Sequence, residues 1–291
     1  MPNTIALSKN YVAMLDEVYK LASKSAILRS DMTLARAGAN ANEIVIPKLS
    51  MDGLADYSRN SGYVKGDVSF TWETVTFNYD RGRMFTVDSM DNEETVELAF
   101  GKLSSEFIRT KVVPEGDAFT FAKLAGITGI STVDAAVLTD GAAVLAAILA
   151  AVTKMDEDEV PVENRHLFIT PTLLNSVKAL DTTKSREALT GFASIVAVPQ
   201  SRFYTAIDLK DGTTTGEEAG HYAKASGAKD INFMLVHKPA VLMFDKHLAN
   251  DVIPPAANQT SDGYLQKYRK YGLVDAYENK VAGIYLHKKT S

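Results

Sequence analysis

Few side chains in the sequence have the type and spacing that chemistry requires. The five histidines are His166, His221, His237, His247 and His287. None stands three or four residues from another on a predicted helix, the spacing that places two metal ligands on one face. Glu93 and Glu94 would point in different directions on a helix, and the acidic run 156–159 lacks the glycine and alternation of a calcium loop. We therefore predict no catalytic, metal or cofactor-binding residues, and no enzyme.

The short signatures of common enzymes are also missing. The sequence contains no phosphate-binding G-x-x-x-x-G-K-[ST], no G-x-G-x-x-G, no G-x-S-x-G and no H-E-x-x-H. Its lack of cysteine excludes thiol nucleophiles, disulfides and thiolate zinc sites. An α/β hydrolase or transferase stays open as an alternative, and it would need polar residues that converge in a cleft.

Composition narrows the class of protein. Hydrophobic residues make up 46% and charged residues 23% of the 291 residues, as in an ordinary soluble globular protein. The formal net charge of −5 argues against a surface that grips nucleic acid, which needs a clustered basic excess. The most apolar segment, 142–152, is about half the length that spans a bilayer. We expect a soluble protein with no membrane segment.

The N-terminal part predicts a helix that needs a partner. Over Ser8–Leu28, Tyr11, Leu15, Val18 and Ala22 recur at helical spacing on one side. That side packs either on the protein's own core or on a neighbouring molecule.

Residues 43–88 follow a period of two and predict a long, partly open β-hairpin. Residues 43–49 read as an edge strand, because Pro47 lacks a donor. A polar, glycine-bearing stretch, 52–67, comes next, and residues 68–77 lead into a second strand over 83–87, with a reversal or bulge near 80–82. Two strands alone are marginally stable, so Phe70 and Trp72 must pack on the protein's own helices or on an adjacent subunit.

The longest helix is predicted from Asp91 to Ala125. Asp91 and Glu94 have the spacing of a capping box, and Val96, Phe100, Leu103 and Phe107 then form an apolar stripe, listed here in order. Pro114 predicts a bend or break near Val113, because proline removes a helical hydrogen bond. A helix–turn–helix is the alternative.

A compact α/β region is predicted from about 131 to 240. Asp140 caps an alanine-rich helix, 141–155, and Thr170–Pro171 opens a second helix that ends at Leu180. Apolar strands are expected at 166–170, 195–198, 203–207, 231–236 and 240–244, with an exposed excursion over 208–230. Further strands are expected after 263.

A family resemblance rests on the order and spacing of several short motifs. They are Gly53-Leu-Ala-Asp-Tyr57, Arg59-Asn60, Gly62-Tyr63, Trp72-Glu73, Asp80-Arg81-Gly82, Phe85-Thr-Val-Asp88, Met90-Asp91, Glu94-Thr95 and Pro114-Glu115-Gly116-Asp117-Ala118-Phe119. Together they resemble the major capsid proteins of tailed bacteriophages with the Hong Kong 97-type fold. The resemblance covers most of the chain and is sharpest between about 53 and 125.

The resemblance implies an α+β capsid fold in four parts. Residues 1–38 would form an N-terminal arm, and 39–88 an extended loop that reaches across an adjacent subunit. Residues 89–130 and 241–291 would form a peripheral domain around the long spine helix, and 131–240 an axial α/β domain. Contacts between subunits would involve Tyr11, Leu15, Tyr57, Arg59, Tyr63, Phe70, Trp72, Arg81 and Arg83.

The function that the resemblance implies is an icosahedral head shell that encloses phage DNA. Its partners would be further copies in hexamers and pentamers, a separate scaffolding protein, a portal, a decoration protein, and packaged DNA bound without sequence specificity. The subunit would assemble in the bacterial host cytoplasm and reside in the virion head. An encapsulin-type compartment is the closest alternative. Some relatives join subunits by a Lys–Asn isopeptide bond, for which Lys65 and Asn258 are conceivable partners.

Overall fold

The computed structural model describes residues 23–30, 36–37, 42–94, 103, 105–135 and 138–290. Tyr11, Leu15 and most of the helix predicted over 8–28 lie outside these ranges. The part of that prediction that can be compared is wrong, because the chain over 23–28 bends and forms only a 3₁₀ turn, η1 (Ala26–Leu28).

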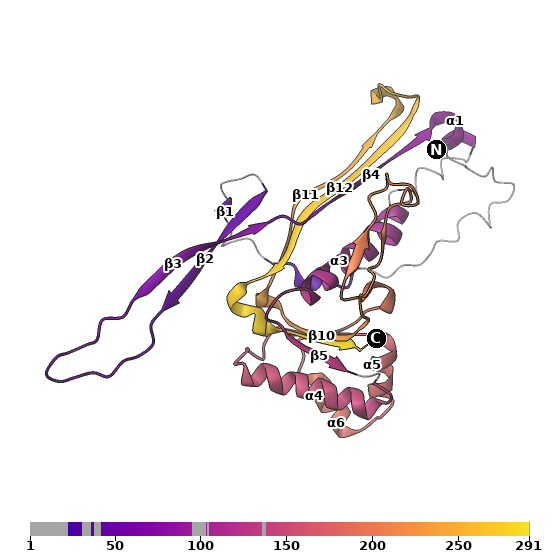
Figure 1. Cartoon of the computed structure of the whole chain (residues 1–291). Coiled ribbons are helices and arrows are strands. Elements are labelled where there is room, and N and C mark those ends of the chain that lie inside the picture. Colours follow the sequence, from indigo (N-terminus) through magenta and orange to yellow (C-terminus); the bar gives the residue numbers. More distant parts are fainter. Residues whose placement is uncertain are drawn as a thin grey trace.

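A five-stranded sheet forms the centre of the compact part of the molecule (Figure 1). Its strands, in spatial order, are β5 (Ser131–Ala135), β13 (Ile284–Lys289), β10 (Ile231–His237), β6 (Arg165–Ile169) and β7 (Ser194–Ala197). β10 runs antiparallel to both β13 and β6, whereas the two outer pairs are parallel. All residues of β6 and β10 are buried, as in a sheet covered on both faces.

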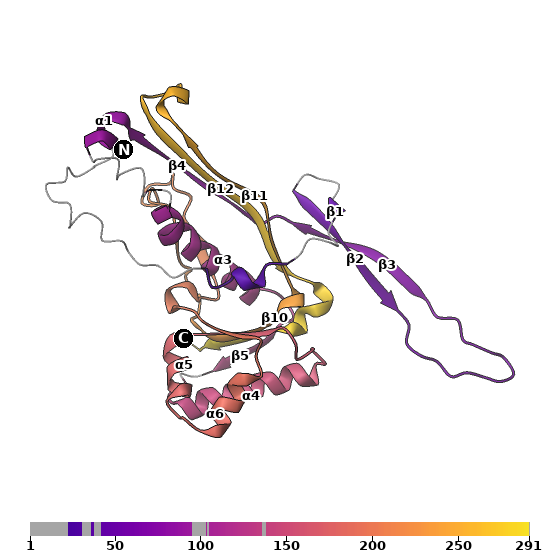
Figure 2. The same cartoon turned by 180° about the vertical axis from the view of Figure 1, so that it is seen from behind.

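Alternate residues of β10 enter two hydrophobic cores. Phe233 and Leu235 contribute to the core beneath α4 (Gly141–Glu157), α5 (Pro171–Lys178) and α6 (Thr183–Thr190). Met234 and Val236 contribute to the core on the opposite face, where α3 (Val113–Ala125) lies. The two views of the ribbon show these helices on opposite sides of the sheet (Figure 2).

The start of α4 follows the sequence prediction. Oδ1 of Asp140 accepts a hydrogen bond from the amide of Ala143 at 2.7 Å. A Cβ at Gly141 would lie 2.2 Å from the carbonyl oxygen of Ser176, so this glycine permits the close approach of α5. α5 also begins at the predicted Pro171 and ends at Lys178.

The long helix is irregular where the proline predicted it. α1 spans Ser89–Glu94, a π-helical turn spans Ile108–Val112, and α3 spans Val113–Ala125. Helical structure is continuous from 105 to 125, which contradicts the helix–turn–helix alternative. α1 begins two residues before the predicted capping box, and Oδ1 of Asp88 accepts the amide of Met90 at 2.9 Å.

A second sheet forms a long ribbon that extends away from the first (Figure 1). It contains β11 (Val241–Ile253), β12 (Gly263–Ala276) and β4 (Tyr79–Asp88), all antiparallel, with β12 in the middle. The predicted reversal at 80–82 is wrong, because β4 runs straight through these residues. A Cβ at Gly82 would lie 2.8 Å from the carbonyl oxygen of Tyr268, so glycine allows the close pairing with β12.

The actual hairpin consists of β2 (Glu43–Met51) and β3 (Val68–Thr76), with β1 (Arg36–Ala37) beside the base of β2. Residues 79–88, expected in the extended loop, therefore belong to the ribbon. Pro47 lies opposite Trp72 of β3 and beyond the two β2 residues that pair with β1, so β1 supplies no partner at this position.

Two further assignments need correction. β13, expected with the peripheral elements in 241–291, pairs with β10 and β5 in the central sheet. The strand expected at 203–207 does not form: after a 3₁₀ turn, η3 (Gln200–Arg202), residues 203–206 make only an isolated bridge from Tyr204 to Asp230. A small hairpin of β8 (Ile207–Leu209) and β9 (Tyr222–Lys224) then follows. Three other 3₁₀ turns connect the last strands: η4 (Lys238–Ala240), η5 (Pro255–Ala257) and η6 (Glu278–Gly283).

Three histidines are buried in the central sheet, and this predicts sensitivity to acid. Burial lowers the pKa of His166, His237 and His287, and nearby cations lower the first two further. In the unfolded chain these groups titrate near the ordinary value of about 6.5. Their neutral forms therefore favour the fold above that pH, and this stability is lost as pH falls toward the folded-state values.

We predict that the urea midpoint falls between pH 7.5 and pH 5.5, and that His287→Gln makes this fall smaller. The variant removes one buried group that must bind a proton only after unfolding. Chemical denaturation followed by circular dichroism measures both midpoints. A wild-type midpoint that rises on acidification, or an unchanged pH dependence in the variant, would contradict the prediction.

Candidate intersubunit surface

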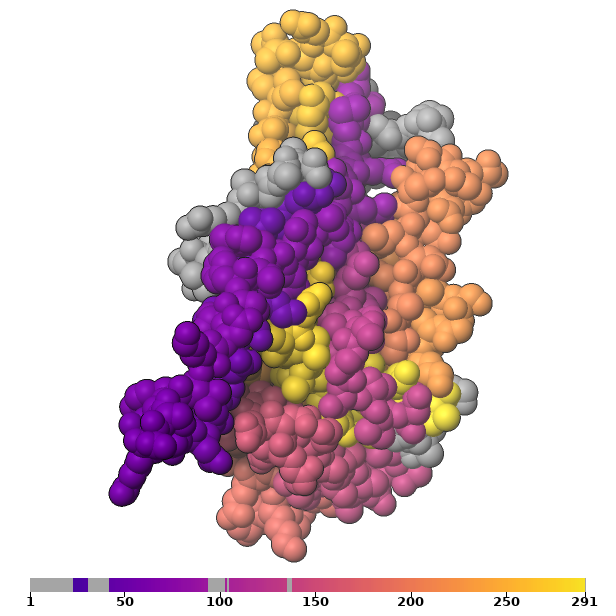
Figure 3. Space-filling model, turned by 60° about the vertical axis from the view of Figure 1, so that its left-hand side comes forward, coloured from indigo at the N-terminus to yellow at the C-terminus, as the bar shows by residue number. Residues whose placement is uncertain are grey.

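The β2–β3 hairpin projects from the body as a narrow arm (Figures 1 and 3). Its strands pair from Glu43–Thr76 at the base to Met51–Val68, and the connecting stretch 52–67 forms the tip. Cross-strand partners share a face, so the register divides the side chains between two faces.

One face holds the base of the arm to the body. Ile44, Ile46 and Val75 are buried there against Leu242, Phe244 and Leu273 of the ribbon, and together they form one hydrophobic cluster. Nζ of Lys48 also lies 2.6 Å from Oε2 of Glu278. Farther out, this face carries small polar residues, Ser50, Ser69 and Thr71.

The other face is apolar and faces solvent in the single chain. It carries the cross-strand pairs Pro47–Trp72, Leu49–Phe70 and Met51–Val68, which we call the apolar ladder. Its five larger side chains are between 45% and 64% exposed. Phe70 and Trp72 meet edge to face, with ring centroids 5.3 Å apart. A contiguous exposed apolar surface of this kind marks a site of association.

The tip adds exposed aromatic and basic groups. The rings of Tyr57 and Tyr63 lie 4.8 Å apart across a tight turn in which Ser58 and Gly62 bond. Arg59 and Leu54 are exposed beside them. Five of the predicted contact residues thus lie on the exposed arm: Tyr57, Arg59, Tyr63, Phe70 and Trp72. The sequence prediction missed Leu49, Met51 and Val68, which share the ladder through the strand register.

Arg81 and Arg83, also predicted to lie at contacts between subunits, bind within the chain in the single subunit, and their intersubunit role stays a prediction. Nε of Arg81 donates to Oε1 of Glu115 at 2.8 Å, and Nη2 donates to the carbonyl oxygen of Lys210 at 2.8 Å. Nη2 of Arg83 donates to the carbonyl oxygen of Glu218 at 2.9 Å. Both arginines hold the β8–β9 hairpin on β4.

Asp117 is a buried junction that the sequence prediction did not single out. Its carboxylate accepts hydrogen bonds from the amides of Lys24 and Ser25 and from the hydroxyls of Ser23 and Ser25, at 2.7–3.0 Å. Nη1 of buried Arg202 lies 2.9 Å from its Oδ2. The helix α3, the N-terminal segment 23–30 and η3 are therefore joined at one carboxylate.

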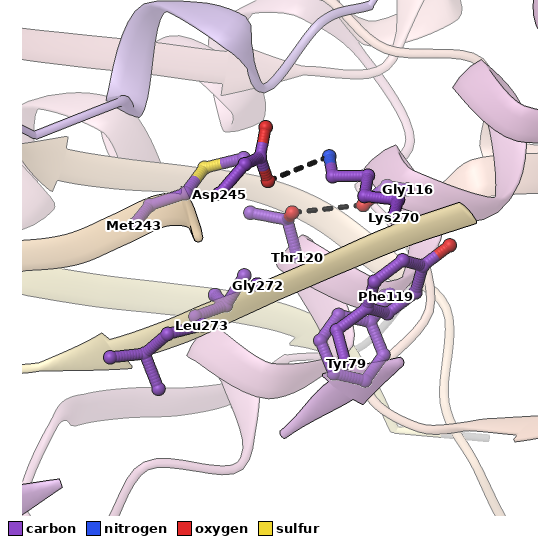
Figure 4. Close-up of a pocket in the computed structure, with 10 residues that line it drawn as sticks. Tyr79, Gly116, Phe119, Thr120, Met243, Asp245, Lys270, Gly272 and Leu273 are labelled. Carbon is purple, nitrogen blue, oxygen red and sulfur yellow. Dashed lines mark hydrogen bonds and ion pairs between the residues drawn. The ribbon is translucent and has the colours of Figure 1, made fainter. Parts of the chain in front are cut away.

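A hollow beside α3 is small for a ligand pocket (Figure 4). The volume open to the centre of a water molecule is about 10 Å³, far below the roughly 300–1,000 Å³ of ligand pockets. Nζ of Lys270 lies 3.1 Å from Oδ1 of Asp245, and the hydroxyl of Thr120 donates to the carbonyl oxygen of Gly116 at 2.8 Å. These polar groups bind one another, so they do not converge on a space for a substrate.

The described residues contain neither a candidate metal-binding cluster nor a helix that could span a membrane. Across these ranges, no three or more histidine, aspartate or glutamate residues gather in a way that could hold a metal ion. None of the helices in the described part of the chain is long and apolar enough to cross a membrane.

Solved phage structures share this arrangement over nearly the whole chain. A structure from Mycobacterium phage Che8 matches with a TM-score of 0.60 and 12% identity, over 99% of this chain and 96% of that one. The mature capsid of bacteriophage PhiM1 matches with a TM-score of 0.66 and 13% identity, over 99% of this chain and 93% of that one. The capsid of cyanophage P-SCSP1u matches with a TM-score of 0.59 and 12% identity, over 97% of this chain and 92% of that one.

The fold predicted from the sequence motifs is thereby confirmed: the chain has the α+β, Hong Kong 97-type capsid fold. No family model matches the chain, and no curated protein matches it. At 12–13% identity the likeness establishes the fold, and the residues that act in assembly have to be argued from this chain's own geometry.

Substitution of Asp117 tests the buried junction. Asp117→Ala leaves the Arg202 guanidinium without its carboxylate, and such a loss in a buried pair costs roughly 3–5 kcal/mol of folding stability. Asp158→Ala is the matched control, because the surface pair with Lys154 contributes about 0–1 kcal/mol. Urea unfolding measures both variants. Equal, small losses would show that Asp117 is not a structural junction.

Proposed function

We propose that the chain is the major capsid protein of a tailed bacteriophage, a subunit of its icosahedral head shell. The observation that carries the proposal is the arm with its exposed apolar ladder, on a fold shared with phage capsids over nearly its full length. The proposed partner of the ladder is a second copy of this chain.

Burial accounts for why the arm needs that partner. Each large apolar side chain is stabilised by roughly 1.5–3 kcal/mol when it moves from water into a packed interface. The costs of association absorb part of this gain, so one arm makes a modest contact. Repetition of such contacts in hexamers and pentamers around a closed shell makes the assembly stable.

The charge of the chain is compatible with a container for DNA. A net charge of −5 leaves no basic excess to bind phosphates, so the shell would enclose DNA without adhering to it, and no sequence-specific binding is proposed. A separate scaffolding protein, a portal and a decoration protein belong to the proposal as partners, as do assembly in the bacterial cytoplasm and residence in the virion head. An encapsulin-type compartment would differ in its contents, which would be a cargo protein.

A covalent link between Lys65 and Asn258 stays a prediction. Lys65 lies in the tip of the arm, whereas Asn258 lies in the loop between β11 and β12. Within one chain, the side-chain amide of Asn258 donates to the carbonyl oxygen of Gly263 at 2.8 Å and to the hydroxyl of Ser261 at 3.0 Å. Intact mass of the denatured shell protein distinguishes linked from unlinked subunits.

Replacing Phe70 and Trp72 together with serine tests the ladder. The double variant removes the two largest side chains of the ladder but leaves the buried base of the arm intact. We expect closed shells to disappear while the folded subunit persists with a urea midpoint close to that of the wild type. Light scattering and negative-stain electron microscopy measure assembly, and circular dichroism measures folding.

The matched control is Ser69→Ala with Thr71→Ala, on the polar face of the same strand. This variant should assemble like the wild type. Loss of folding in the Phe70 and Trp72 variant would favour packing of these rings within the chain. Normal shells from that variant would contradict the ladder as the contact between subunits.

A further inference from the structure

The β8–β9 hairpin (residues 207–224) is attached to the rest of the molecule through main-chain groups and two arginines. Arg81 donates to the carbonyl oxygen of Lys210 at 2.8 Å and to that of His221 at 3.4 Å. Arg83 reaches the carbonyl oxygen of Glu218, and a Cβ on Gly212, whose φ is +80°, would lie 2.8 Å from Nη1 of Arg83. The hairpin loop is thus shaped around the arginines of β4.

Glu115 is the carboxylate at the centre of this attachment. Its Oε1 accepts from Nε of Arg81 at 2.8 Å and from the hydroxyl of Tyr79 at 3.2 Å. Burial alone would raise the pKa of Glu115, but its proximity to His221, its hydrogen bond with Arg81 and the charge of Arg81 hold it below the ordinary value. The group is therefore ionised at neutral pH, at the first turn of α3.

The ring of His221 lies close to Glu115, but its Nδ1 has no hydrogen-bond partner among the described residues. Its Nδ1 is buried and makes no hydrogen bond with the described residues, yet it lies 3.6 Å from Oε2 of Glu115. The backbone of His221 has a φ of +74°, an uncommon conformation for a residue with a side chain. A buried, unsatisfied nitrogen that faces a carboxylate is costly when it carries no proton.

Charged and titratable groups from α3, β4 and the hairpin surround the ring of His221. Glu115 faces it from α3, and Arg81 and Tyr79 from β4. The hairpin itself contributes Tyr222, whose ring centroid is 4.5 Å away, the Lys210–Glu217 pair, Asp211 and Glu218, with Arg83 adjacent to Gly220. Glu115 is the carboxylate that forms an ion pair with the ring.

We propose that His221 and Glu115 form a pH-sensitive latch that fastens the β8–β9 hairpin to the first turn of α3. Protonation of the ring makes both of its nitrogens donors, so Nδ1 points a donor at Glu115 and the ring adds a positive charge opposite that carboxylate. The latch tightens as pH falls and loosens as pH rises. It couples the central sheet to the ribbon within one subunit, and it does not depend on the proposed shell function.

Hydrogen exchange of the full-length protein tests the latch. We expect protection factors over 207–224, corrected for the intrinsic exchange rate at each pH, to be roughly threefold to fivefold higher at pH 5.5 than at pH 8.0. His221→Asn should abolish this rise, because asparagine tolerates the positive φ but does not titrate. His247→Asn, on the exposed part of β11, should retain it.

Opposite behaviour elsewhere in the chain makes the readout specific. The buried histidines of the central sheet predict lower global stability in acid, so a local gain in protection cannot come from them. Light scattering verifies an equal assembly state at both pH values. Equal protection of 207–224 at both pH values, or a pH response that persists in His221→Asn, would overturn the latch.

Discussion

The N-terminal part of α3 places two carboxylates, Glu115 and Asp117, in the interior, and the connections between the parts of the chain depend on them. Asp117 is fully buried and joins the N-terminal segment 23–30 to η3 through Arg202. Glu115, two residues earlier in the same helix, joins β4 and the β8–β9 hairpin through Arg81. Buried ions are costly unless they are paired and hydrogen-bonded, so each partner is held in a defined position.

This constraint explains how the central sheet and the ribbon are joined. The central sheet is covered on both faces, whereas the ribbon of β11, β12 and β4 extends away from it. Phe119 and Phe121 of α3 pack in the core that the two regions share, and Tyr79 of β4 lies 4.8 Å from Phe119. The helix therefore carries both the apolar contacts and the ionic contacts between them.

The arm differs along its length, because the apolar side chains of its base are buried within the chain and those of its outer part are exposed. The alternation of the two strands buries Ile44 and Ile46 but leaves Leu49, Met51 and Phe70 in water. A monomeric protein has no use for such a surface, whereas a repeated subunit can cover it with the next copy. This contrast is the physical basis of the proposed shell function.

Local signals made much of the fold predictable. Asp140 and Pro171 mark helix starts, and Pro114 marks the irregular turn at Ile108–Val112. Pairing between distant segments was not predictable: the motif at 80–82 resembles a turn, but β12 draws it into a straight strand. β13 was grouped with the wrong sheet for the same reason.

The residues of the candidate surface also divide into those that their type made predictable and those that only the pairing of distant segments reveals. Aromatic residues of the arm stood out by type, whereas Leu49, Met51 and Val68 join them only through the register of β2 and β3. The bonds of Arg81 and Arg83 to carbonyl groups of the β8–β9 hairpin were not predictable, because a sequence does not show which distant carbonyl groups surround a side chain. Asp117 has no sequence signal beyond its place after a proline, since its partners lie about 85 to 94 residues away.

Cryo-electron microscopy of particles purified after expression of the chain together with its neighbouring phage genes tests the central claim most directly. The account predicts closed icosahedral shells in which the ladder residues of each arm, Phe70 and Trp72 among them, are covered by an adjacent copy. DNA inside the shells would support a phage head, and a captured protein would support a compartment. A uniform small species, or shells in which the ladder remains in solvent, would contradict the account.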